Sequence, residues 1–135
     1  MDAQEFQDYA AANPAIRQVL EHAASTIPAR SFGLPTEMAG VVLLFPVVRF
    51  ILTDIGLPWL ATLRKYSEVQ RRRVEDWIDR HAAEHGLNPD EVETAGKAFI
   101  EDLEQTTDGK ARHQWEHLAE LLKTGADGAR PSGRE

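Results

Sequence analysis

Residues 38–63 read MAGVVLLFPVVRFILTDIGLPWLATL, and only Arg49 and Asp54 carry a formal charge within this stretch. Seven large apolar side chains share one side of a helical projection, and apolar residues continue around most of the remainder. A helix that is apolar on nearly all sides is surrounded either by protein or by lipid. We expect this helix to cover residues 36–55 and to end at Gly56, because glycine is a common helix terminator.

The choice between protein and lipid depends on length and charge. The longest charge-free run, residues 38–48, is shorter than the stretch of about 20 residues that a membrane span needs. Arg49 and Asp54 would each cost about 2.5–3.5 kcal/mol near the centre of a bilayer. We therefore expect a cytoplasmic protein with a central apolar core helix. The alternative is a membrane-associated subunit anchored by residues 38–63, which a basic cluster follows in the positive-inside sense.

The rest of the sequence also has helical spacing and helix-start signals. No second apolar run offers a strand partner for Val41–Phe45. The pattern predicts an all-α bundle of about five to six helices. Their predicted starts are Asp2, Asn13, Thr36, Pro58, Asn88 and either Asp108 or Thr107.

The longest predicted helix runs over residues 58–85. Its apolar face is interrupted by the polar residues Ser67 and Gln70, which suggests two separate packing stations on one helix. We expect an N-terminal helical lobe over residues 1–73, built around the apolar helix, and a C-terminal three-helix lobe over 74–124. The two lobes would share the long helix. The glycine-rich and polar residues 125–135 are typical of a disordered tail.

Composition excludes several function classes. The 135 residues include no cysteine, so disulfides, thiolate nucleophiles and cysteine-ligated metal centres are absent. Lysine and arginine total 15 against 22 aspartate and glutamate residues, and the net charge of −7 argues against a nucleic-acid partner. No phosphate-binding loop, calcium loop or nucleophile elbow occurs. We assign no cofactor and no small-molecule ligand.

Four of the five histidines form two H-x-x-E-H strings, at residues 81–85 and 113–117. Each five-residue string resembles the zinc-binding motif of the inverted-zincin metalloproteases, in which two histidines bind zinc and the glutamate acts as base. A zinc site needs a third protein ligand, and only a short segment follows His117. We expect His113 and His117 to face solvent. His81 and His85 remain candidate metal ligands, with a metal-dependent hydrolase as the third functional hypothesis.

One basic cluster follows the apolar stretch. Acidic residues occur four positions away from two of its arginines, as in Glu68 and Arg72, and such pairs are typical of a solvated helix face. Phosphate groups of anionic lipids are the alternative partner. The candidate basic patch consists of Arg64, Lys65, Arg71, Arg72 and Arg73.

The favoured function is a non-catalytic one, namely binding to another protein or to a second copy. If the two small lobes do not cover the long apolar helix completely, the exposed remainder marks an interface. We therefore predict an adaptor or assembly module that self-associates. It would form a homodimer or bind a dedicated protein partner. The candidate apolar interface residues are Phe45, Val48, Phe50, Ile51 and Trp59.

Overall fold

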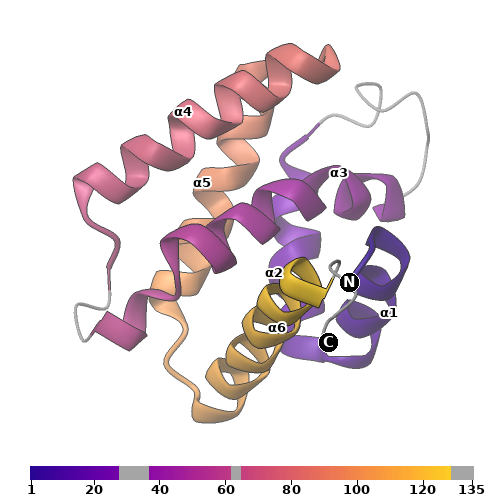
Figure 1. Ribbon diagram of the computed structural model, residues 1–135, viewed down its shortest axis with the longest axis vertical. Coiled ribbons are helices and arrows are strands. Elements are labelled where there is room, and N and C mark those ends of the chain that lie inside the picture. The colour runs from indigo at the N-terminus through magenta and orange to yellow at the C-terminus, as the bar shows by residue number, and fades with distance from the viewer. Residues whose placement is uncertain (28–36, 62–64, 129–135) are drawn as a thin grey trace.

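The computed structural model describes residues 1–27, 37–61 and 65–128, with the backbone alone at 37–42, 61 and 125–128. The described chain contains six α-helices and no β-strand (Figure 1). The predicted all-α fold is therefore confirmed. The α-helices are α1 (Ala3–Ala12), α2 (Pro14–Ser25), α3 (Glu37–Phe50), α4 (Glu68–His85), α5 (Pro89–Gln105) and α6 (Gly109–Gly128).

Helices α1, α5 and α6 begin at side-chain caps that the sequence predicts. Helix α4 begins at a capping box of Ser67 and Gln70, which the prediction did not use as a helix start. Asp2 and Glu5 form a reciprocal capping box at the start of α1. The side chain of Asn88 accepts from the amide of Asp90, and that of Asp108 accepts from the amide of Ala111. Asn13 behaves differently from the prediction. Its side-chain nitrogen donates to the Tyr9 carbonyl at 2.7 Å, so it supports the end of α1 instead of capping α2.

Helix α2 occupies the centre of the molecule and packs against α1, α3, α5 and α6. Its buried side chains Ile16, Leu20 and Ala23 have no exposed surface. Buried residues from before and after position 73 belong to one hydrophobic cluster. The core therefore extends without interruption across the predicted boundary between the lobes.

The apolar helix is confirmed over most of its predicted length, and its last turn has a different geometry. Helix α3 passes directly into a π-helical segment, η2 (Ile51–Ile55), in which the Gly56 amide donates to the Ile51 carbonyl at 2.8 Å. Gly56 follows with φ 94° and ψ 176°, a conformation available essentially only to glycine. One side of the segment is buried, through Leu44, Val47, Val48, Ile51 and Leu52.

The prediction of one helix over residues 58–85 is wrong. A short 3₁₀ helix, η3 (Pro58–Ala61), comes first, and α4 begins only at Glu68. Ser67 accepts from the Gln70 amide, and the Gln70 side chain accepts from the Ser67 amide. Ser67 and Gln70 are thus a capping box that starts a helix, not a polar gap within one.

Helices α4 and α5 lie side by side and are joined by a tight turn (Figure 1). Gly86 ends α4 in the left-handed conformation, with φ 69°. Gly96 permits the close approach, because a Cβ atom there would lie 2.8 Å from Cδ1 of Ile78. Helix α6 continues to Gly128, so the first residues of the predicted tail are helical, and residues 129–135 lie outside the described chain.

Candidate functional site

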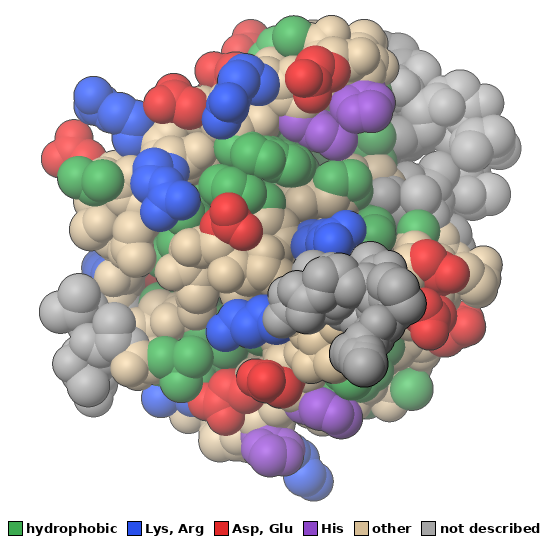
Figure 2. Space-filling model, in the orientation of Figure 1, with side chains coloured by type: hydrophobic (Ala, Val, Ile, Leu, Met, Phe, Trp, Pro, Cys, Tyr) green, Lys and Arg blue, Asp and Glu red, His purple; other side chains and the backbone are tan. Residues whose placement is uncertain are grey.

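An open hollow lies on the surface where α3 and η2 meet α4. Its volume is about 410 Å³. Figure 2 shows hydrophobic side chains gathered between α3 and α4, with histidine side chains close by. We call this surface the aromatic face, and its lining residues are Phe45, Pro46, Arg49, Phe50, Thr53, Asp54 and Trp77.

The lining residues of α3 and η2 recur four positions apart along the helix. Thr53 lies four residues after Arg49 and Asp54 lies four residues after Phe50, so in a regular α-helix each pair already points to one side, about 40° apart. All four residues line the hollow, which therefore continues from α3 into the π-helical segment η2. The Thr53 hydroxyl lies 2.7 Å from the Arg49 carbonyl and 3.0 Å from Oδ1 of Asp54. These contacts keep Asp54 beside the hollow.

Stacked rings form the wall between the two helices. The rings of Phe50 and Trp77 are 4.9 Å apart and nearly parallel, at 11°. The His81 ring also stacks on Trp77, with centroids 4.8 Å apart at 9°, and the His85 ring lies 4.4 Å from that of His81. Phe45 contacts Phe6 of α1 at the opposite end, with ring centroids 4.9 Å apart. The sequence interpretation did not single out Trp77, although the spacing 77, 81, 85 along one helix face was available.

The aromatic face carries two opposite charges. Arg49 and Asp54 are both exposed, and neither has an ion pair within the described part of the chain. Their position beside apolar rings makes them available to an opposite charge on a partner.

The structure separates the five predicted interface residues into two groups. Phe45, Phe50 and Trp59 are half-buried and reach the surface, whereas Val48 and Ile51 have 1% and 0% exposure. Val48 and Ile51 point from the opposite side of the helix into the core. They are therefore not accessible for contact with another molecule.

Trp59 lies away from the aromatic face and packs against α6. Its indole nitrogen donates to Glu116 at 2.9 Å, and the Arg112 guanidinium lies over its ring at 5.1 Å. These contacts within the chain hold η3 against α6.

The predicted basic patch is divided among different contacts. Arg71 donates to both carboxylate oxygens of Glu104, at 2.6 and 2.7 Å. Arg72 lies 3.9 Å from Glu68, as the spacing predicts. Lys65 and Arg73 are exposed, and Arg64 lies outside the described residues. Among the described members, Arg71 thus contacts a buried carboxylate and Arg72 an exposed one.

Glu104 is the centre of a structural clamp. Its side chain is only 6% exposed, and it also accepts from the Tyr66 amide at 2.8 Å. The Tyr66 hydroxyl donates to the Gly56 carbonyl at 2.8 Å. Burial raises the pKa of Tyr66 well above its ordinary range, and the neighbouring Glu104 charge adds to this effect. The clamp thus ties the end of η2 to α4 and α5.

The histidine pairs lie in different surroundings. His81 and His85 contact each other, and burial, followed by the neighbouring His85, lowers the pKa of His81. His113 and His117 are exposed, as predicted, and Nδ1 of His117 lies 3.1 Å from the Tyr9 hydroxyl. Within the described ranges no group of three or more potential ligands is positioned to hold a metal ion.

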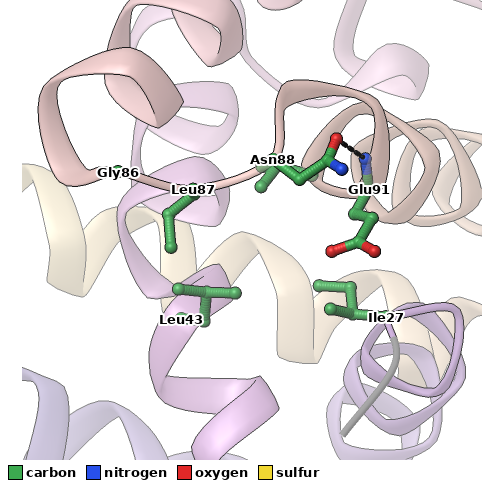
Figure 3. Close-up of a pocket in the computed structure, with 7 residues that line it drawn as sticks. Ile27, Leu43, Gly86, Leu87, Asn88 and Glu91 are labelled. Atoms are coloured by element: carbon green, nitrogen blue, oxygen red, sulfur yellow. Dashed lines mark hydrogen bonds between the residues drawn. The ribbon is translucent and has the colours of Figure 1, made fainter. Parts of the chain in front are cut away.

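A second hollow of about 350 Å³ lies at the turn between α4 and α5, beside the end of α2 (Figure 3). Ile27, Leu43 and Leu87 supply apolar side chains, and Asn88 contacts the Glu91 amide at its rim. Residues 28–36 adjoin Ile27 but are not described. We therefore assign no ligand to this hollow.

The segment Leu43–Leu60 is long and apolar enough to cross a membrane, judged by its length and composition alone. Its mean hydropathy is 1.6, and 39% of the segment is buried inside the protein. Within this segment the backbone leaves the helical conformation at Gly56. Core helices of soluble proteins satisfy the same criteria.

Comparison with known proteins adds no relationship. No protein-family model, curated protein or solved structure matches the chain.

Proposed function

We propose that this protein is a non-catalytic interaction module that self-associates through the aromatic face. The main support is the partial burial of Phe50 and Trp77, whose rings stack on each other, pack against the core with one part and line the open hollow with another. Large aromatic side chains are enriched at the centres of protein interfaces, because they bury much surface at a small cost in conformational entropy.

Partial burial leaves apolar area that a second molecule can cover. Each square ångström of apolar surface removed from water contributes about 25 cal/mol. Phe45, Pro46, Phe50 and Trp77 provide this area in one open hollow. A partner surface would be expected to insert its own apolar side chains between α3 and α4.

Sedimentation velocity of the full chain over a range of concentrations tests the proposal. We expect reversible association for the natural protein and its loss in Phe50→Glu, which places a charge among the rings. The matched control is Val69→Glu, because Val69 is 71% exposed on α4 and does not line the hollow. Circular dichroism confirms that each variant is folded.

Two results would contradict the proposal. One is a monomer at every concentration, and the other is association that Val69→Glu abolishes and Phe50→Glu does not. Trp77→Ala gives a second variant if Phe50→Glu fails to fold.

A membrane-associated role is the second candidate, favoured by the apolar window Leu43–Leu60. It would require lipid to surround a segment in which Leu44, Val47 and Val48 already pack inside the protein. Flotation with vesicles that contain anionic lipid tests this role. Recovery of the protein in the floating vesicle fraction, in the absence of detergent, would support it.

A further inference from the structure

We infer that the partner on the aromatic face is a second copy of this chain, related by a two-fold axis that pairs Arg49 of each copy with Asp54 of the other. The inference rests on the proposed self-association. It adds how the two copies are oriented and which charged residues pair between them. The observations that carry it are the opposite signs, the shared face and the absence of ion pairs for these residues in the described chain.

Two-fold symmetry imposes a simple relation between contacts. If residue i of one copy meets residue j of the other, then j of the first also meets i of the second. Two η2 segments that cross in opposite directions, with the axis between Phe50 and Thr53, place each Arg49 near the partner's Asp54. The dimer then contains two equivalent Arg49–Asp54 pairs, one on each side of the axis.

The positions of the two charges fit this arrangement. Arg49 precedes Phe50 and Asp54 follows Thr53, so the charges lie at the two ends of the short central stretch. Both residues line the hollow, where the hydroxyl of Thr53 also contacts Asp54.

A partner with a single sign of charge fits less well. An acidic segment would pair with Arg49 and repel Asp54, and a basic segment would do the reverse. Like charges brought together at an interface cost several kcal/mol, whereas a second copy satisfies both residues at once.

Charge reversal tests the pairing directly. In Arg49→Glu each copy presents two acidic residues at the paired positions, and in Asp54→Arg it presents two basic residues. We expect each single variant to weaken association roughly 10- to 100-fold in sedimentation equilibrium. An equimolar mixture of the two should form a heterodimer with near-natural affinity, because each contact then joins opposite charges. The double variant R49E/D54R should recover association for the same reason.

Arg49 and Asp54 are exposed, so the charge reversals leave the core unchanged. Thermal unfolding verifies that each variant is as stable as the natural protein. A matched control is Arg73→Glu, since Arg73 is exposed on α4 and does not line the hollow. It should not change association.

The outcomes separate the two proposals. If the natural chain associates and single reversals have no effect, or if neither the mixture nor the double variant recovers, the two-fold pairing is wrong while self-association stands. If the natural chain remains a monomer at all concentrations, the proposed function fails together with this inference.

Discussion

Two tryptophan–phenylalanine pairs in this protein have similar chemistry and different surroundings. Phe99 and Trp115 join α5 to α6 inside the core, with ring centroids 5.4 Å apart at 73°, and neither side chain is exposed. Phe50 and Trp77 join α3 to α4 at the surface and stack at 4.9 Å and 11°. The side chains of the first pair are completely buried, whereas those of the second pair are only partly buried.

The difference shows what aromatic residues contribute in each place. The buried pair fills volume that several helices share, even though the Trp115 indole N–H has no hydrogen-bond partner among the described residues. The surface pair leaves apolar area facing solvent next to two exposed charges. The buried pair therefore stabilises the fold, and we propose that the surface pair supports association.

The largest expected effect is the difference in the free energy of unfolding between variants of Trp115 and Trp77. Trp115→Ala should lower the free energy of unfolding by about 3–5 kcal/mol, because it leaves a cavity in the core. Trp77→Ala should cost only about 1–2 kcal/mol, since the ring is already half-exposed. Denaturant unfolding monitored by circular dichroism measures both. Equal losses would mean that the surface pair is as important to the fold as the core pair.

The clamp around Glu104 gives the next largest effect. Arg71→Ala leaves the buried Glu104 carboxylate without its guanidinium partner, and we expect a loss of about 2–3 kcal/mol. Arg72→Ala is the matched control. Its partner Glu68 is 3.9 Å away and exposed, so the change should be at most about 0.5 kcal/mol. Similar losses in the two variants would contradict the role assigned to the clamp.

Gly56 links the stability of the core to the geometry of the aromatic face. An L side chain is strained at φ 94°, and Gly56→Ala should cost about 1–2 kcal/mol although nothing obstructs the new Cβ. Gly109→Ala, at a helical position with equally open space, should cause no loss and should stabilise the fold by up to about 1 kcal/mol. Thermal unfolding compares the two variants, and sedimentation shows whether a shift in η2 also weakens association. A neutral Gly56→Ala would show that the turn adapts without cost.

The smallest effect concerns the other side of α4, which faces α5. A hydrogen bond with Asp79, burial, and the charges of Asp79 and Glu75 raise the pKa of Glu93 from 4.5 to about 7, and Lys97 opposes the shift. The folded state therefore binds this proton more tightly than the unfolded state. Its contribution to stability is present below pH 4.5 and is lost as the pH rises to about 7.

Glu93→Gln removes the carboxylate that becomes unfavourable at high pH. The variant should match the natural protein near pH 4.5 and exceed its stability by up to about 1 kcal/mol above pH 7, a small value because the site is partly solvated. Unfolding measured across this pH range checks the prediction, with the exposed Glu101→Gln as control. A difference that is constant with pH would exclude the assigned cause.

Much of the helical pattern could be predicted because its signals are local. Asp2, Asn88 and Asp108 start helices through bonds to amides two or three residues away. The Ser67–Gln70 box is equally local, and the predicted long helix was wrong because these residues were interpreted as a polar gap. The candidate site was predicted less well. Helical spacing indicates which residues share a side, but it does not reveal which neighbouring helix covers that side.

The amino-acid sequence by itself determined that the described chain is helical, that the protein contains no cysteine chemistry, and that its most apolar helix includes Glu37–Phe50. These properties follow from composition and from interactions within a few residues along the chain. Only the tertiary structure decided that Val48 and Ile51 face the core while Phe50 meets Trp77, and that the last turn of the apolar helix is π-helical. Burial depends on contacts between residues far apart in sequence, and a single extra residue in a turn redirects every side chain that follows it.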